Sequence, residues 1–217
     1  MAYKVVIFDL DGTLLDTLDD LGGAVNHALG KRGFPLHGRD EYRRMVGHGI
    51  RNLVMSALPA GFQEDDRLVD ECLSDFKSYY TTHIDVHTRP YEGMAELLRE
   101  MRDRGVAMAV ASNKFQEGTE TLIREFFPDI PFICILGNQE GFPLKPDPQI
   151  VNEVLRRSGQ PAADAAALVG DSPTDMKTAR NGGIWGIAVQ WGYRDMAEGD
   201  GYSVAADPDE LRALLLG

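Results

Sequence analysis

The feature that most constrains the fold is an unbroken apolar run at residues 5–8 that ends in two carboxylates, Asp9 and Asp11. Such a run of β-branched and aromatic residues is typical of a strand buried on both faces. In an extended segment residues i and i+2 point to the same side, so both carboxylates leave the strand together. Open parallel α/β sheets bind ligands at the carboxyl ends of their strands. The sequence therefore predicts a site with two carboxylates at the end of the first strand.

The Asp11-Gly12 pair could instead close a hairpin and leave both carboxylates in solvent. We prefer the site because Leu14-Leu15 begins a helical pattern rather than a return strand. Two like charges this close require a cation, a shared proton or a lysine nearby. We therefore expect compensating groups further along the chain.

A helical block follows the first strand. Apolar residues keep helical spacing from Asp16 to about Arg32, and further helical segments are predicted at 40–46, at 50–57 and up to about Tyr80. No convincing strand lies between Asp16 and Thr88. We predict a helical cap domain at 16–88, inserted into a core domain formed by 1–15 and 89–217.

After this block, strands alternate with helices. Buried strands are predicted at 106–111, 132–136, 167–169 and 184–189, with a further one at 202–205. Helical segments separate them. This alternation predicts an α/β fold with a doubly wound parallel sheet.

Composition narrows the range of partners. A formal net charge of −12 and the absence of a dense Lys/Arg run argue against nucleic acids and anionic membranes. No apolar run could span a bilayer, and no signal peptide is recognised. Cys72 and Cys134 lie far apart in apolar contexts, which favours free thiols in a reducing compartment. We expect a cytoplasmic protein, and the sequence makes no prediction of its oligomeric state.

Polar side chains gather where predicted strands end or where the following loops begin. Because the carboxyl ends of parallel strands share one edge of the sheet, these groups can converge on a single pocket. They are Asp9 and Asp11, Ser112 and Asn113, Lys145, and Asp171 and Asp175.

The order and spacing of these groups resemble the four motifs of the haloacid dehalogenase-like (HAD) hydrolases in their phosphatase form. The first motif is Asp9-Leu-Asp-Gly-Thr-Leu-Leu-Asp16, and the likeness continues through Arg89-Pro90-Tyr91-Glu92-Gly93, Val169-Gly-Asp-Ser172 and Trp191-Gly192-Tyr193. The resemblance covers most of the chain and is closest to the phosphoglycolate-phosphatase-like branch. It implies a Rossmann-like core with an inserted cap, and a phosphatase acting on a small phosphorylated metabolite.

The resemblance also implies roles by position. Asp9 matches the nucleophile that forms an aspartyl-phosphate, and Asp11 matches the general acid that later activates water. Ser112 matches the residue that hydrogen-bonds a phosphoryl oxygen, with Asn113 beside it at the substrate. Lys145 matches the lysine that pairs with the nucleophile and the transferring phosphoryl group.

The implied cofactor is Mg²⁺, for which hard oxygen ligands are suited. By position, Asp171 would bind the metal directly beside Asp9 and the Asp11 carbonyl, and Asp175 would bind through water or orient Lys145. Plainer explanations exist for each residue taken singly: helix caps for Asp171 and Asp175, and exposed surface for Lys145. The ordered set favours the functional interpretation.

Two further assignments stay open. Gly47-His48-Gly49-Ile50-Arg51 resembles the substrate-facing cap segment of the family. The planar guanidinium of Arg51, with His48 as a weaker candidate, suits a substrate carboxylate such as that of 2-phosphoglycolate. A plain cap-surface pair explains these two residues equally well. Lys114 is either a solvated loop residue or a phosphate contact.

Other functions share parts of this pattern. Pyrophosphatases, sugar-phosphate phosphatases and phosphomutases of the same superfamily use the aspartate pair, although Thr13 and the 112–114 triplet look more like phosphatases. Dehalogenases lack the second aspartate. A phospho-acceptor regulatory module of the receiver type would lack Asp11 and the helical insertion.

Overall fold

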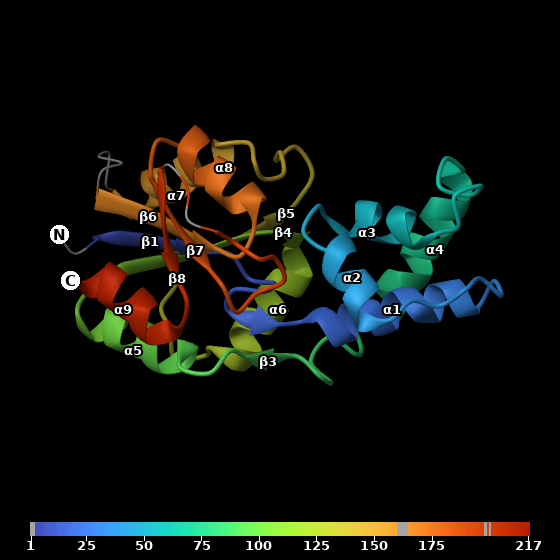
Figure 1. Cartoon of the computed structure of the whole chain (residues 1–217), viewed down its shortest axis with the longest axis horizontal. Coiled ribbons are helices and arrows are strands. Elements are labelled where there is room, and N and C mark those ends of the chain that lie inside the picture. Colours follow the sequence, from blue (N-terminus) through green and yellow to red (C-terminus); the bar gives the residue numbers. More distant parts are fainter. Residues whose placement is uncertain (1–2, 160–164, 198, 200) are drawn as a thin grey trace.

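The core of the molecule is one parallel sheet with β1 among its central strands (Figure 1). The computed structural model describes residues 3–159, 165–197, 199 and 201–217. Its six-stranded sheet has the order β5-β4-β1-β6-β7-β8, and every neighbouring pair is parallel. The strands are β1 Val5–Phe8, β4 Ala107–Phe115, β5 Cys134–Asn138, β6 Ala166–Gly170, β7 Trp185–Val189 and β8 Tyr202–Ala205. The predicted fold class is confirmed.

Helices cover both faces of this sheet. Val5 and Ile7 pack in a cluster with residues of α7 and α8, whereas Val6 and Phe8 pack in the cluster that includes α5, α6 and α9. All four β1 side chains are fully buried, which explains the unbroken apolar run. The helices are α5 Met94–Asp103, α6 Gln116–Phe126, α7 Gln149–Ser158, α8 Pro173–Asn181 and α9 Pro208–Leu216.

One strand is longer than predicted. The apolar pattern ends at Ala111, but β4 continues to Phe115 and contains Ser112, Asn113 and Lys114. These polar side chains are nonetheless buried. The apolar pattern therefore ends where β4 enters the site, although the backbone stays extended as far as Phe115.

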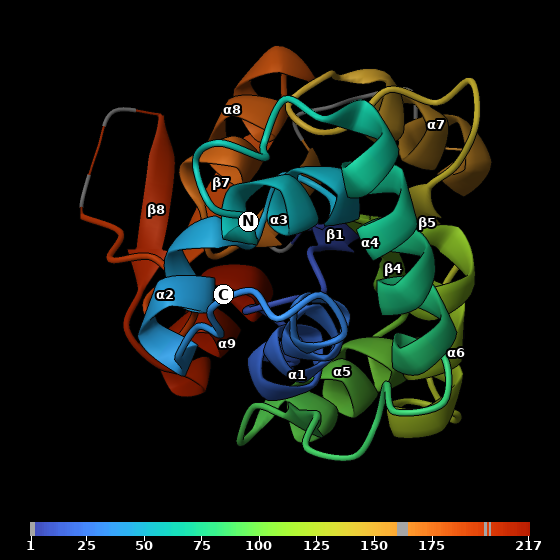
Figure 2. The ribbon, with the colours of Figure 1, turned by 90° about the vertical axis from the view of Figure 1, so that its right-hand side faces the viewer.

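Four helices of the inserted block form a separate layer beyond the carboxyl edge of the sheet. Figure 2 views the molecule from that side, with α1 and α4 in front. Their apolar faces pack together and onto the cluster that includes Val6 and Phe8. Within the described ranges, no helix is long and apolar enough to cross a membrane. The helices are α1 Leu18–Gly30, α2 Arg39–Met45, α3 Ile50–Ala57 and α4 Asp66–Tyr80.

The two connections between this layer and the sheet pair with each other. β2 (Leu15–Asp16) is antiparallel to β3 (Arg89–Pro90). The expectation that a helical pattern begins at Leu14-Leu15 was wrong, because β2 comes first and α1 begins only at Leu18. The expectation of no strand between Asp16 and Thr88 is confirmed, since residues 17–88 contain none. A two-residue strand is too short to show a period of two, and its partner lies more than seventy positions away.

A buried carboxylate reinforces this paired connection. Asp20, in the first turn of α1, accepts hydrogen bonds from the backbone N–H of His87 at 2.9 Å and from that of Thr88 at 2.8 Å. The Thr88 hydroxyl donates to the same carboxylate at 2.8 Å. Asp20 is only 4% exposed. The start of the helical block is thus tied directly to its end.

We predict that Asp20→Ala lowers the free energy of unfolding by about 1–3 kcal/mol, because it leaves buried N–H donors without a partner. Asp19→Ala is the matched control. Asp19 lies in the same first turn, but its carboxylate is half exposed and paired with Arg39. Urea unfolding of both variants checks the prediction, and equal losses would contradict it because the helix-dipole contribution is common to both.

Candidate active site

A cavity lies where the carboxyl edge of the sheet meets the helical layer. The helical layer contributes mainly apolar groups and two glycines, and the core contributes the charged ones. The space in this cavity that the centre of a water-sized sphere can occupy measures ≈ 40 Å³, and on this measure one water needs roughly 10–15 Å³. The cavity therefore suits a group of a few heavy atoms. Among its lining residues are Asp9, Asp11, Ser112, Asn113, Lys114, Lys145, Asp171, Asp175, Tyr193 and Arg194 from the core, and Leu21, Val46, Gly47, Gly49, Ile50 and Leu53 from the helical layer.

Lys145 lies at the centre of the charged groups. Its Nζ is 2.8 Å from Asp9 Oδ1 and 2.6 Å from Asp175 Oδ1, and its side chain is 3% exposed. Burial disfavours the charged ammonium, but Asp175 and Asp9 outweigh it and raise the pKa of Lys145. The lysine therefore stays protonated, and the surface interpretation of Lys145 is excluded.

Asp175 serves the fold and the site together. Ser172 is the N-cap of α8, and the Asp175 carboxylate completes the capping box by accepting from the Ser172 backbone N–H at 3.2 Å. The Ser172 hydroxyl also donates to Asp175 Oδ2, at 2.5 Å. Since Asp175 Oδ1 accepts from Lys145, both oxygens are engaged. The capping role considered for Asp175 and the role of orienting Lys145 are therefore compatible.

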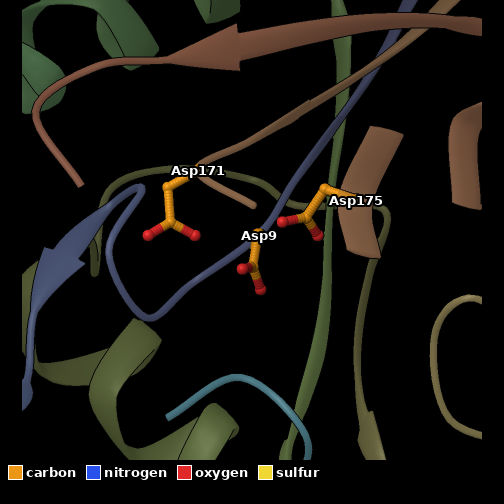
Figure 3. A group of neighbouring side chains, drawn as sticks. All are labelled: Asp9, Asp171 and Asp175. Atoms are coloured by element: carbon orange, nitrogen blue, oxygen red, sulfur yellow. The ribbon is translucent and has the colours of Figure 1, made fainter. Parts of the chain in front are cut away.

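Asp9, Asp171 and Asp175 form a buried carboxylate cluster (Figure 3). One oxygen of each lies within 4.8 Å of the others. Burial, with Asp175 and Asp171 adding to it, raises the pKa of Asp9, against the opposing effect of Lys145. Burial and Asp175 likewise raise the pKa of Asp171 to about 7. One lysine thus compensates only part of the charge of three carboxylates.

These residues fit a divalent cation. The donors are carboxylate oxygens, which Mg²⁺ prefers. Three of them lie within 4.8 Å of one another, and Lys145 is the cation in contact with Asp9 and Asp175. The side chain of Asp11 lies outside the three-carboxylate cluster.

Asp11 points to different partners. Its Oδ1 accepts from the Thr17 hydroxyl at 2.5 Å and from Lys114 Nζ at 3.1 Å. The Lys114 side chain is 1% exposed, and its ammonium also lies 4.7 Å from the centre of the Tyr80 ring of α4. Lys114 is therefore neither a solvated loop residue nor directed at the three-carboxylate cluster. Within the described residues, no donor reaches Asp11 Oδ2.

Asn113 holds the backbone that presents Lys145. Its Oδ1 accepts from the Lys145 N–H at 2.8 Å, and its Nδ2 donates to the Lys145 carbonyl at 3.2 Å and to the Gly47 carbonyl at 3.1 Å. The neighbouring Ser112 Oγ accepts from the Lys114 N–H at 3.1 Å, which leaves its own hydrogen to donate into the cavity.

The two cap residues suggested by the sequence do not line this cavity. Arg51, half exposed, forms ion pairs with Asp66, at 2.6 Å, and with Asp70. His48 is exposed. The cations that do line the cavity, besides Lys145, are Lys114 and Arg194.

Sequence reasoning gave no role to Thr17, Tyr193 or Arg194. Thr17 holds Asp11, and the Tyr193 N–H donates to Asp171 Oδ2 at 2.6 Å. Tyr193 belongs to a stretch that carries the family resemblance, which was a usable signal. Thr17 and Arg194 have no local pattern that distinguishes them from surface polar residues.

Comparison with known proteins settles the family. The sequence profile of the haloacid dehalogenase-like hydrolases matches residues 6–189, which is most of the chain. The chain belongs to this family. The stretches that resemble the family's motifs lie on β1, on β4, in the loop before α7 and at the β6–α8 turn.

Proteins similar to this chain indicate which activity within the family it has. Phosphoglycolate phosphatase of Mesorhizobium japonicum is 36% identical over 200 residues, which cover 90% of this chain and 86% of that protein. The Pseudomonas putida enzyme of the same name is 33% identical over 217 residues, or 99% of this chain and 79% of that protein. A crystal structure of a provisionally assigned phosphoglycolate phosphatase from Lactobacillus delbrueckii subsp. bulgaricus has a TM-score of 0.90 at 30% identity and covers 100% of both chains. The chain is a HAD phosphatase, a hydrolase of phosphoric monoesters in the phosphoglycolate-phosphatase-like branch, as expected.

We predict that Lys145→Ala lowers the free energy of unfolding by about 3–5 kcal/mol at neutral pH, because it removes the ammonium between two buried carboxylates. Lys177→Ala, on the exposed side of α8, is the control and is expected to leave stability nearly unchanged. Urea unfolding in a buffer with EDTA measures both. A Lys145→Ala variant as stable as the control would mean that the carboxylates are neutralised in another way.

Proposed function

We propose that this HAD phosphatase hydrolyses 2-phosphoglycolate with Mg²⁺, through an aspartyl-phosphate on Asp9. The observation that carries the proposal is the position of Asp9. It lies at the end of β1, bound to Lys145, within one cavity that also holds Asp11 and Ser112. A nucleophile, a proton donor and a phosphoryl-binding hydroxyl are thereby within reach of one small substrate.

In the first step an Asp9 carboxylate oxygen attacks phosphorus, and the bond between phosphorus and the ester oxygen breaks. The Lys145 ammonium, held 2.8 Å from Asp9, faces the negative charge of the transferring group. Ser112 donates its hydroxyl hydrogen to a phosphoryl oxygen. The leaving alkoxide takes a proton from Asp11.

The hydrogen bonds of Asp11 indicate which oxygen carries that proton. Thr17 and Lys114 both donate to Oδ1, which leaves Oδ2 to hold the proton. In the second step Oδ2 takes a proton back from water as the water attacks phosphorus. The bond between Asp9 and phosphorus then breaks, which releases inorganic phosphate and restores the Asp9 carboxylate and the protonated Asp11.

The cation has a defined place in this proposal. Asp9 and Asp171 would hold it, with Asp175 beside them, and bound Mg²⁺ would neutralise charge on the carboxylates and on the phosphoryl oxygens. The close approach of three buried carboxylates supports a cation there, because burial, with neighbouring carboxylates adding to it, raises the pKa of Asp9 and of Asp171 and so disfavours their charged forms in its absence.

The helical block 16–88 acts as a cap over the core formed by 1–15 and 89–217. Leu21, Ile50 and Leu53 put apolar surface on the cavity wall, which supports a role in excluding water. The paired connection of β2 and β3 is the place where the cap would pivot.

The substrate's carboxylate needs a cation at the end of the pocket remote from phosphorus. In 2-phosphoglycolate the carboxylate is attached to the carbon that bears the leaving oxygen, and that oxygen must approach Asp11. Lys114 is 3.1 Å from Asp11 and nearly fully buried. When Asp11 is protonated, Lys114 loses its counter-charge and is free to pair with the carboxylate. We therefore assign this role to Lys114, since Arg51 would first have to break two ion pairs.

We predict that EDTA abolishes turnover, that Mg²⁺ restores it, and that Asp9→Asn lowers kcat by at least ~10³ because an amide cannot form the covalent intermediate. Asp209→Asn is the control, since Asp209 is exposed in the first turn of α9 and lies outside the cavity lining. Full activity after exhaustive EDTA treatment, or near-normal turnover by Asp9→Asn, would refute the mechanism.

We also predict that Lys114→Ala lowers kcat/KM for 2-phosphoglycolate by roughly 10–150-fold more than for ethyl phosphate, in which a methyl group replaces the carboxylate. Ethyl phosphate corrects for any effect of Lys114 on Asp11. Arg51→Ala should affect both substrates equally.

If only Arg51→Ala lowered kcat/KM selectively for 2-phosphoglycolate, Arg51 and not Lys114 would be the residue that binds the substrate carboxylate. A preference of the wild type for pyrophosphate or a sugar phosphate would reject 2-phosphoglycolate and leave the reaction itself in place.

A further inference from the structure

One short loop of the core contacts the cap and the charged cluster at once. The loop Trp191–Asp195 follows β7 at the carboxyl edge of the sheet, and Figure 2 shows α2 of the cap beside it. Its backbone packs tightly on the site. A Cβ atom at Gly192 would lie 2.2 Å from the Asp171 Cβ and 2.4 Å from the Gly12 carbonyl oxygen. Any shift of this loop is therefore transmitted to Asp171.

Two arginines join this loop to α2 in opposite directions. Arg43 of the cap donates from Nε to the Tyr193 carbonyl at 2.8 Å and from Nη2 to the Gly192 carbonyl at 3.2 Å. Arg194 of the core donates back to the carbonyls of Arg43, of Arg44 at 3.1 Å and of Val46 at 2.7 Å. These carbonyls end α2, where a cation is favoured by the helix dipole. The cap thus binds the backbone of the core loop, and the core loop binds the backbone of the cap.

The loop residue between these contacts holds two carboxylates. The Tyr193 N–H donates to Asp171 Oδ2 at 2.6 Å. The Tyr193 hydroxyl accepts from the Thr17 N–H at 2.8 Å and lies 3.2 Å from the Thr17 hydroxyl. Thr17 in turn donates to Asp11 Oδ1 at 2.5 Å. Tyr193 is therefore hydrogen-bonded directly to Arg43 of the cap, to Asp171 and to Thr17.

We propose that Arg43 and Arg194 form a closure latch and that Tyr193 is the positioning residue through which it acts. With the cap closed, the latch fixes the peptide groups on both sides of Tyr193. Tyr193 then holds Asp171 by its N–H and Asp11 by way of Thr17. With the cap open, the five hydrogen bonds of the latch are lost and Tyr193 is held less firmly. Full orientation of both carboxylates is thereby limited to the closed state.

The chemistry of the latch suits repeated opening. Its acceptors are neutral carbonyls. Among the described residues, the fully exposed Asp195 pairs with Arg43 at 3.6 Å, and Asp171 interacts electrostatically with Arg194. Hydrogen bonds of this kind are individually weak in net free energy. Arginine is required because its planar fork reaches two carbonyls at once, which lysine cannot do.

The test compares Arg43→Ala, Arg194→Ala, the double variant and Arg43→Lys with the matched control Arg44→Ala. Arg44 neighbours Arg43 on α2, and its exposed side chain makes no hydrogen bond or ion pair with another described residue. The measurements are kcat and KM for 2-phosphoglycolate, the dissociation constant of Mg²⁺ by calorimetry, and the melting temperature.

We expect both alanine variants to lower kcat roughly tenfold and to weaken Mg²⁺ binding by a factor of about ten, the lower end of the effect of losing an outer partner of a metal ligand. Arg43→Lys should remain impaired. The double variant should lose less than the product of the single losses, because both arginines act on one loop. Tyr193→Phe should lower kcat without weakening Mg²⁺ binding, since its backbone N–H is unchanged.

The latch rests on the proposed metal role of Asp171, and the two ideas fail differently. A wild type that binds no Mg²⁺ and needs none would reject the proposed function. A wild type that needs Mg²⁺, together with arginine variants that lose only melting temperature, would reject the latch and leave the arginines a purely stabilising role. Recovery by Arg43→Lys would also overturn it, because charge alone would then suffice.

Discussion

The structure depends on the ammonium of Lys145, which is buried between Asp9 and Asp175. Three buried carboxylates this close cannot all be ionised without compensation, and one lysine offsets only part of their charge. The site therefore retains negative charge that Lys145 does not neutralise. In the proposed mechanism a bound cation neutralises it. The negative phosphoryl group then enters a site whose positive charges are already in place.

The fold brings these groups together by topology. β1 lies between β4 and β6, so the segments that follow these three strands meet at one edge. Glycines make the close approach possible. Gly12 has a φ of 84°, and a Cβ there would lie 2.3 Å from Asp171 Oδ2. The helical block is inserted directly after β1, so the cap leaves the core within a few residues of Asp9 and Asp11. A movement of the cap would therefore begin within a few residues of these two carboxylates.

Features with a local sequence pattern could be predicted from the sequence, whereas contacts between residues far apart in the sequence could not. Asp9, Asp171 and Lys145 could be placed because strand ends and helix starts have local patterns, and the parallel sheet then fixes where they meet. Thr17 and Arg194 could not be placed, since each acts on a partner that no local pattern identifies. The interpretation of Arg51 relied on residue type, whereas the ion pairs with Asp66 and Asp70 depend on how α3 packs on α4. The β2–β3 pairing was missed for a similar reason, as it joins segments far apart in sequence.

The central claim is that Asp9 carries the phosphoryl group during turnover. The most direct test is to quench the enzyme with acid during steady-state hydrolysis of 2-phosphoglycolate, reduce it with borohydride and map the peptides by mass spectrometry. Borohydride converts an aspartyl-phosphate to homoserine, so the account predicts homoserine at position 9 only when substrate and Mg²⁺ are both present. Phosphate found on Ser112, or hydrolysis with no modification at Asp9, would contradict it.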